Sequence, residues 1–348
     1  MSTLTLPPVT DLHDAALAGR LQHVIDNKTK PLGALGRLEA LALRIGSILG
    51  SEKPVLAQPQ MLVCAGDHGL AARGVSAYPS DVTGQMVENF LAGGAAVSVL
   101  ARQHGLALTV IDCGVRRDFA PRPGLVVRKV AQGTADASTG PAMTPAQCAE
   151  AIANGMGVVR DLPGNALLLG EMGIGNSSVA AMLLARLVGD DIEACTGAGT
   201  GLDAEGRNRK ARVLRDVLAL HAGATSPLDA LAAFGGFEVA TLVGAVLQAA
   251  EERRVLVVDG FIASAAVLVA QALRPHVVQR CVAAHVSAEP GHALLLAHLG
   301  LDPLLHLDLR LGEGSGAALA WPLLESACAL LRDMASFEAA GVARKDAA

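Results

Sequence analysis

The segment richest in chemical possibilities is GEMGIGNSS, residues 170–178, which follows the apolar run NALLLG and precedes the helical pattern VAAMLLARLVG. Its glycines let the backbone turn so that N–H groups face a ligand, and the start of the following helix adds partial positive charge. No Gly-Lys-Ser/Thr follows, so this is not a Walker loop. Two interpretations stay open: a cradle for a phosphate group, or a tight turn capped by Asn176 or Ser177.

A second glycine cluster, TGAGTGLD at residues 196–203, precedes the basic stretch RNRK at residues 207–210. Two anion-friendly loops and a cationic side chain together indicate a small phosphorylated substrate. Either loop alone is equally compatible with a plain connection, and Lys210 also fits the solvated face of a helix.

The third segment, RLGEGSG at residues 310–316, places the single carboxylate of Glu313 among glycines and beside apolar residues. No bulky neighbour shields such a carboxylate from a substrate, and partial desolvation raises its pKa towards that of a useful general base. The alternative is an acid at a helix N-terminus, favoured there by the helix dipole.

Other polar residues follow apolar runs without forming a metal site. His68, His285 and His292 are expected to be hydrogen-bonded turn residues, and no H-x-x-x-H pair or carboxylate at ligand spacing accompanies them. We therefore expect no catalytic metal and no cofactor. Asp259, after RVLVV, has two open interpretations: contact with ribose hydroxyls, or a cap on the next helix.

These candidate residues lie at the ends of apolar runs that alternate with helical patterns. Such alternation predicts an α/β fold with a mainly parallel sheet covered by helices on both faces. In sheets of this kind, ligands bind beyond the carboxyl ends of the strands, where the unusual residues fall. The runs are QMLVCAGDHG, LALTVIDCGV, NALLLGEMGIG, RVLVVDGF and CVAAHVSAEPG.

The two chain ends differ from the middle. Residues 11–25 and 317–334 read as helices with no strand between them and the termini, although Pro322 is expected to kink the second helix or to delay its start. We predict a large α/β domain over residues 29–313 and a small helical domain formed by residues 1–28 and 314–348.

Composition excludes several classes of protein. A net charge of −5 with one Trp and one Tyr offers neither a basic stripe nor a stacking platform for nucleic acid. The six cysteines contain no C-x-x-C pair and are expected to be reduced, and the N-terminus does not resemble a secretion signal, which favours the cytoplasm. The apolar window 255–273 contains Asp259-Gly260, which favours a strand, a turn and a helix over a membrane span.

Ten motifs taken together resemble the nicotinate-nucleotide:dimethylbenzimidazole phosphoribosyltransferase family, which assembles the nucleotide loop of cobalamin. The resemblance runs in consistent order from about Asn27 to Leu319. The motifs are KPLGALGRLEALA (30–42), AGDHG (65–69), VSAYPSDVTGQMVENFLAGGAAVSVLARQHG (75–105), DCGV (112–115), GEMGIGNSS (170–178), TGAGTGLD (196–203), GGFE (235–238), VDGFIASAA (258–266), HVSAEPGH (285–292) and RLGEGSGAALA (310–320).

The resemblance implies a Rossmann-like sheet with a smaller helical domain from both chain ends, and a homodimer without bound metal. It assigns the general base to Glu313, with Glu171 in the same site. Ser76 and Ser80 are alternative positions for one serine of the base pocket. The implied contacts are Gly173, Ile174, Gly175, Asn176, Thr200, Gly201, Lys210, Ser287 and Asp259 for phosphate and ribose, and Ser80, Gln85, Met86 and Leu311 for the base.

The reaction implied by the resemblance is transfer of phosphoribosyl from nicotinate mononucleotide to 5,6-dimethylbenzimidazole or a related base. Two rival functions are an NAD-dependent dehydrogenase and a nucleotide sensor without catalysis. The first lacks G-x-G-x-x-G at the first strand-to-helix turn with an acidic residue about 20 positions later. The second has no use for Glu313, and is distinguished by binding without turnover.

Overall fold

Parallel strands form the centre of the molecule in the computed structural model, which describes residues 4–199 and 201–343 of the 348. Six strands in this part of the chain form one sheet in the order β3-β2-β1-β4-β5-β6. This is the order of a doubly wound fold, whose winding reverses between β1 and β4. The strands are β1 (Gln60–Gly66), β2 (Ala107–Gly114), β3 (Leu125–Val127), β4 (Ala166–Met172), β5 (Val255–Val258) and β6 (Cys281–Ala283).

Successive side chains of a strand point to opposite faces of the sheet, and both faces are buried in a hydrophobic core. Leu62 and Cys64 of β1 belong to one core, and Met61 and Val63 belong to the other. The predicted α/β fold with helices on both faces is confirmed. The first core contains residues of α5 (Pro145–Asp161), α6 (Asn176–Val188), α9 (Pro227–Phe234), α10 (Phe237–Glu251), α11 (Phe261–Leu273) and α12 (Pro290–Leu299). The second contains residues of α1 (Ala15–Asp26), α2 (Arg37–Leu49), α3 (Asp81–Ala92), α4 (Ala96–His104) and α13 (Ser315–Asp333).

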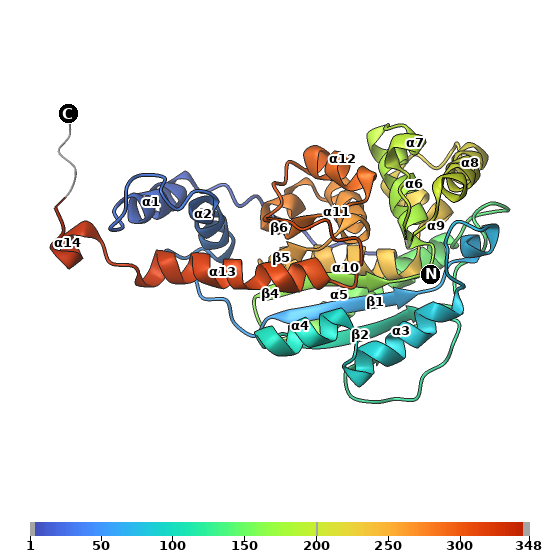
Figure 1. The fold of residues 1–348 in the computed structure, drawn as a ribbon, viewed down its shortest axis with the longest axis horizontal. Helices are drawn as coiled ribbons and strands as arrows, with labels where there is room; N and C mark the ends of the chain where they lie inside the picture. The colour runs from blue at the N-terminus through green and yellow to red at the C-terminus, as the bar shows by residue number, and fades with distance from the viewer. Residues whose placement is uncertain (1–3, 200, 344–348) are drawn as a thin grey trace.

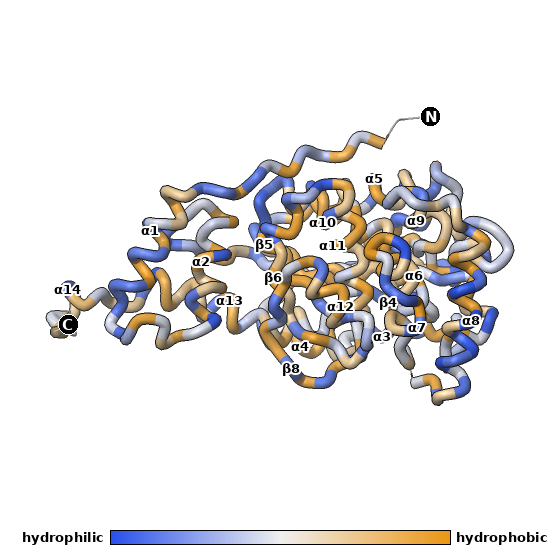
Figure 2. The backbone as a smooth tube through the Cα atoms, turned by 90° about the horizontal axis from the view of Figure 1, so that it is seen from above, coloured by the Kyte–Doolittle hydropathy of each residue, from blue (hydrophilic) through white to orange (hydrophobic). Residues whose placement is uncertain are grey.

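Each of the five apolar runs contains a strand. The last run also forms β7 (His285–Val286), which pairs in parallel with β8 (Leu305–His306). Residues 255–273 form β5 and α11, as the Asp259-Gly260 break predicts. Apolar residues concentrate in these central elements, whereas α8 (Ala204–Leu220) is largely hydrophilic (Figure 2). Within the described ranges, no helix has both the length and the apolar character needed to cross a membrane.

The two ends of the chain pack together beside the sheet. Leu21 of α1 and Leu331 of α13 are buried in the same core, and the Lys28 ammonium donates a hydrogen bond to the Met334 carbonyl at 2.6 Å. α13 runs from the sheet to the end of the molecule where α1 and α2 lie (Figure 1). Because α13 packs against β4 and β5 as well as against α2, the domain boundary at residue 313 stays a prediction.

The terminal helices begin at different residues from those predicted. α1 starts at Ala15 because the Asp14 carboxylate accepts a hydrogen bond from the Leu17 N–H, as an N-cap does. The alternative in which Pro322 delays the start of the C-terminal helix is wrong, because α13 begins at Ser315 and contains Pro322. A proline removes one donor, but the first turn of α13 is held by a distant carboxylate, described below.

Candidate active site

A cleft opens beyond the carboxyl ends of β4 and β5, beside the point where the winding of the sheet reverses. The space inside it is about 730 Å³, part of it open to solvent. Its lining comes from six separate segments of the chain. The residues are Val75, Ser76, Glu171, Met172, Gly173, Ile174, Gly175, Asn176, Ser177, Gly199, Gly260, Phe261, Ile262, His285, Ser287, Glu289, Arg310, Leu311 and Gly312.

One wall of the cleft is the predicted glycine loop between β4 and α6. Gly175 has a φ of 99°, a left-handed conformation that favours glycine, and α6 begins at the next residue. The loop is fixed to α3, because the Ile174 N–H donates to the buried Thr83 hydroxyl at 3.2 Å. Among the first N–H groups of α6, those of Asn176 and Ser178 donate to the Gly173 and Gly175 carbonyls at 3.1 and 3.0 Å, so this wall offers an anion the remaining donors and the partial positive charge of the helix N-terminus.

The second glycine loop lies beside the first, since a Cβ at Gly199 would be 2.9 Å from the Ser177 hydroxyl oxygen and 3.4 Å from Lys210 Nζ. The Lys210 ammonium is fully buried and donates to the Ser177 hydroxyl at 2.8 Å, so it reaches the cleft through that side chain. Burial lowers the pKa of Lys210 to about 8, although the charge of Glu289 opposes this shift. The Glu289 carboxylate accepts a hydrogen bond from the Gly199 N–H at 2.9 Å. Gly201 belongs to this loop and is exposed, whereas Thr200 lies outside the described residues.

A left-handed turn presents Glu313. Its φ is 65°, and Gly312 and Gly314 on either side have φ values of 80° and 89°. The Glu313 N–H donates to the Glu171 carbonyl at 3.2 Å, which attaches the turn to the end of β4. The turn also lies close to Gly170, where a Cβ would be 2.3 Å from the Glu313 carbonyl oxygen. Glycine at position 170 therefore makes this close approach possible.

The two glutamates are buried and hold their protons more tightly than usual. Burial, with smaller contributions from Asp259 and Glu238, raises the pKa of Glu171 to about 8, although its carboxylate accepts a hydrogen bond from the Asn176 side chain. Burial also raises the pKa of Glu313 to about 7, against the opposing hydrogen bond from the Val97 N–H. Glu313 Oε2 is buried without a hydrogen-bond partner among the described residues. A carboxylate in this state is suited to accept a proton near neutral pH.

Two hydrogen-bonded histidines support the opposite wall, and neither is the predicted turn residue, since His285 lies in β7 and His292 in the first turn of α12. His292 Nδ1 accepts a hydrogen bond from the Ser287 N–H at 2.9 Å, and its Nε2 lies 3.0 Å from the Ser264 hydroxyl. Burial lowers the pKa of His292 to about 3, so the ring is neutral and Nε2 carries the hydrogen. This contact orients Ser287 at the cleft. His285 lines the cleft, and its ring Nε2 lies 3.3 Å from the Asp259 carboxylate. Asp259 itself does not line the cleft.

The residues predicted to hold an aromatic base are divided between the cleft and α3. Leu311 lines the cleft and is 58% exposed. Ser80 precedes the first residue of α3, and Gln85 and Met86 lie on that helix, outside the lining of the cleft. Of the two alternative serines, Ser76 lines the cleft. The bond between Thr83 and Ile174 connects α3 to the glycine loop, so its side chains lie beside the candidate site.

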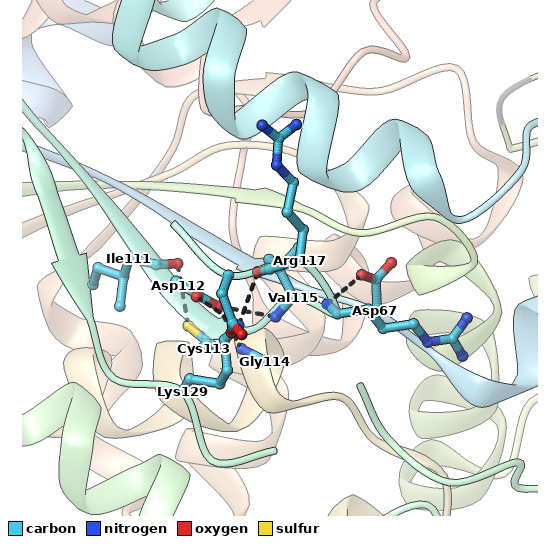
Figure 3. A network of polar contacts seen from close by, with 10 residues as sticks. Asp67, Ile111, Asp112, Cys113, Gly114, Val115, Arg117 and Lys129 are labelled. Atoms are coloured by element: carbon cyan, nitrogen blue, oxygen red, sulfur yellow. Dashed lines mark hydrogen bonds and ion pairs between the residues drawn. The ribbon is translucent and has the colours of Figure 1, made fainter. Parts of the chain in front are cut away.

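A second polar network lies at the carboxyl ends of β1 and β2 (Figure 3). The Asp112 carboxylate accepts hydrogen bonds from the Gly114 and Val115 N–H groups at 3.1 and 2.9 Å, and Asp67 accepts one from the Arg116 N–H at 2.9 Å. These bonds fix the backbone at the end of β2, and neither Asp67 nor Asp112 lines the cleft. In the part of the chain that the structure describes, no group of three or more His, Cys, Asp or Glu side chains is placed to hold a metal ion.

Three residues that shape the site were absent from the predicted set. Thr83, Ser177 and Glu289 each join two segments, and their partners are 91, 33 and 90 residues away in sequence. A hydroxyl or carboxylate of this kind has no local signal beyond its place in a motif. Ser177 and Glu289 lie inside GEMGIGNSS and HVSAEPGH, so the motifs mark the segments but leave the roles of single residues open.

The fold and the cleft define a doubly wound enzyme with an anion-accepting loop and buried carboxylates, and a family model described as Phosphoribosyltransferase matches residues 10–342. The chain belongs to the nicotinate-nucleotide–dimethylbenzimidazole phosphoribosyltransferase family. A member from Variovorax paradoxus (strain S110) is 81% identical over 99% of both chains, and one from Cupriavidus necator is 57% identical over 97% of this chain and 99% of that one. The crystal structure of CobT from Thermus thermophilus has a TM-score of 0.92 and 43% identity, covering 95% of this chain and 100% of that chain.

Proposed function

We propose that this chain transfers the phosphoribosyl group of nicotinate mononucleotide to 5,6-dimethylbenzimidazole or a related base, with Glu313 as the general base. The products are α-ribazole 5′-phosphate, nicotinate and a proton. One observation carries the proposal: in a chain of this family, the cleft joins the N-terminus of α6 to the buried Glu171, and Glu313, whose pKa is also raised, lies next to the lining residue Gly312.

The chemistry requires positioning more than activation of the leaving group. Breaking the bond between C1′ and the pyridinium nitrogen returns the electron pair to that nitrogen and neutralises a cation. The lone pair of one benzimidazole nitrogen forms the new bond to C1′ from the opposite face, which converts a β glycoside into an α one. Binding energy from the phosphate fixes C1′ near the incoming nitrogen and lowers the entropic part of the barrier.

The phosphate and ribose are proposed to lie against the glycine loop. The first helical turn after this loop supplies N–H donors. The Ser177 hydroxyl, which accepts a hydrogen bond from Lys210, and Ser287 also line the cleft. The proposed contacts are Gly173, Ile174, Gly175, Asn176, Thr200, Gly201, Lys210 and Ser287.

Glu313 is proposed to take the proton from the second nitrogen of the benzimidazole as positive charge develops on that ring. Its carboxylate has an unpaired, buried oxygen, and Glu171 beside it is the second candidate for this role. A positioned base contributes about 10²–10⁴-fold, so most of the acceleration comes from orientation and charge placement. The base itself is proposed to rest near Leu311 and the α3 residues Ser80, Gln85 and Met86.

The family resemblance also supports a homodimer, and the phosphorylated nucleotide substrate of the proposed reaction supports a cytoplasmic location. We propose both for this chain. Light scattering coupled to size-exclusion chromatography tests the first: the proposed species has twice the mass of one chain, and a single-chain mass at working concentrations contradicts it.

The reaction is tested by incubating the purified protein with nicotinate mononucleotide and a panel of aromatic bases, with and without EDTA, and identifying products by mass. We expect equimolar nicotinate and α-ribazole 5′-phosphate in both arms, because the leaving group is already cationic. Binding without turnover indicates a sensor. Turnover that is lost with EDTA and restored by one divalent ion contradicts the metal-free mechanism.

A further inference from the structure

The turn that carries Glu313 is held in place from a different part of the fold. α13 begins immediately after this turn, and its N-cap is Gly314, a residue without a side chain to cap the helix. The Asp259 carboxylate supplies the missing acceptors: it receives hydrogen bonds from the Gly314 N–H at 3.1 Å and the Ala317 N–H at 3.0 Å. Asp259 follows the end of β5, so one carboxylate ties the turn to the central sheet.

Asp259 is itself fixed by His285. The ring Nε2 of His285 lies 3.3 Å from Asp259 Oδ1, and both side chains are buried. The first turn of α13 rests on this pair, because a Cβ at Gly316 would lie 2.1 Å from His285 Cδ2 and 2.8 Å from Asp259 Oδ1. The carboxylate, the imidazole and the start of the helix therefore form one packed unit behind Glu313.

We propose that Asp259 is a positioning residue for Glu313, oriented in turn by His285, and that Asp259 acts on the proton-transfer step rather than on ribose binding. The proposal rests on the proposed role of Glu313 as the base. A left-handed conformation at a residue other than glycine costs about 1–3 kcal/mol and persists only where its surroundings enforce it. Three hydrogen bonds hold the turn in this conformation. Two run to Asp259 on the C-terminal side of the turn, and the third runs from the Glu313 N–H to the Glu171 carbonyl on its other side.

The charge of Asp259 affects the same step. It contributes to the raised pKa values of both Glu313 and Glu171. The other ionisable groups facing this unit are Glu238 on α10, which adds negative charge near Glu171, and His292 on α12, which stays neutral. Burial lowers the pKa of His285, but the hydrogen bond and charge of Asp259 outweigh it and raise that pKa. His285 is therefore the partner that orients the Asp259 carboxylate.

The test compares Asp259→Asn and His285→Gln with the parent by steady-state kinetics across pH. Asp259→Asn keeps the shape but loses the charge and one acceptor, so kcat should fall by about 10-fold or more while KM for nicotinate mononucleotide stays within about 3-fold. The acid limb of the kcat profile should move to lower pH in Asp259→Asn, because the base ionises more easily without a neighbouring anion. In His285→Gln kcat should fall by a smaller factor while the acid limb stays near that of the parent, because Asp259 keeps its charge but loses the side chain that orients it.

An acid limb that moves to lower pH in Asp259→Asn, together with a smaller fall in kcat in His285→Gln, supports the proposal. A fall in kcat in both variants with unmoved limbs means a purely structural role and overturns it, as does an Asp259→Asn variant with parental kcat. A rise in KM for the mononucleotide without a change in kcat means that Asp259 binds ribose. Titration of each variant with nicotinate mononucleotide shows that its site is folded, and His285→Gln still tests the pair if Asp259→Asn does not fold. Glu313→Gln is measured in parallel: parental kcat in that variant rejects the base itself, whereas parental kcat in Asp259→Asn alone rejects only the positioning role.

Discussion

At the scale of single residues, Lys210 shows how a buried charge acts through a neighbour. Its ammonium has no exposure to solvent and donates to the Ser177 hydroxyl, which lines the cleft. Lys210→Met should therefore raise KM for nicotinate mononucleotide by about 10- to 100-fold, with a smaller effect on kcat, because a phosphate contact present in ground and transition states acts mainly on binding. Steady-state kinetics with the mononucleotide and with its phosphate-free riboside measure this.

The riboside should be almost unaffected by Lys210→Met, and Ser177→Ala should reproduce part of the loss. Lys28→Met is the matched control, because Lys28 is, like Lys210, a buried lysine with a hydrogen-bond acceptor. Its acceptor is the Met334 carbonyl, among the terminal helices and away from the cleft. Equal losses for mononucleotide and riboside place Lys210 away from the phosphate.

Single residues are also where sequence-based prediction was least complete. Glu313 could be singled out because its glycine neighbours form a local signal. Asp259 could not be assigned to one role: it caps neither the next helix nor a local turn, but α13, whose N-cap Gly314 lies 55 residues later. Thr83 and Glu289 were missed for the same reason, because their partners are brought close only by the fold.

At the scale of elements, the close contact between the end of β4 and the Glu313 turn is open to a direct test. A Cβ at Gly170 would lie 2.3 Å from the Glu313 carbonyl oxygen and 2.9 Å from the Gly314 nitrogen, and both are backbone atoms that cannot rotate away. Gly170→Ala should displace the turn and lower kcat by about 10-fold or more, since small misplacements of catalytic groups are costly. Gly157→Ala is the control, because no heavy atom lies within 4 Å of a Cβ at that position of α5.

Parental activity in Gly170→Ala means that the contact between β4 and the turn has no part in positioning Glu313. Circular dichroism of both glycine variants separates this outcome from loss of the fold. A helical Gly157→Ala substitution is expected to be neutral or slightly stabilising.

The strands could be predicted better than the terminal helices. A continuous apolar run that ends in glycine or an acidic residue is a strong signal for a buried parallel strand, and each of the five runs contains one. The start of α13 was harder to place, because Pro322 suggests a local break while the hydrogen bonds from Gly314 and Ala317 to Asp259 set the beginning earlier. Tertiary contacts overrode the local preference.

At the scale of the whole molecule, the buried glutamates make stability depend on pH. The folded-state pKa of Glu171 is about 8, above its value of about 4.5 in an unfolded chain. The folded state therefore binds more protons than the unfolded state between these two values, so this group's contribution to stability is present below pH 4.5 and is lost as the pH rises through about 8. Glu313 contributes with the same sign, with its loss centred near pH 7.

Glu171→Gln should remove most of this dependence. At pH 9 we expect the variant to melt roughly 3–6 °C above the parent, because it does not bury a charge, whereas at pH 5 the two should be similar. Differential scanning calorimetry of the substrate-free proteins measures both. A Glu171→Gln variant that is destabilised equally at both pH values shows that the parent's carboxylate is already ionised and paired in the folded state.

The family could be predicted because ten motifs in order carry more information than any one of them, and the comparisons confirmed it, whereas the roles of the single site residues stay predictions. The strand order follows from no local pattern and emerged only from the structure. The division into a domain of residues 29–313 and one formed by both chain ends stays a prediction, because α13 belongs to the packing of both.

The most direct test of the account is the turnover number of Glu313→Gln with nicotinate mononucleotide and dimethylbenzimidazole, both saturating, at pH 8. Glutamine keeps the size of the side chain but cannot accept the proton, so kcat should fall by about 10²-fold or more while the affinity for nicotinate mononucleotide stays near that of the parent. A kcat within a few-fold of the parent contradicts the assignment of Glu313 as the base, and Glu171 then becomes the residue to substitute.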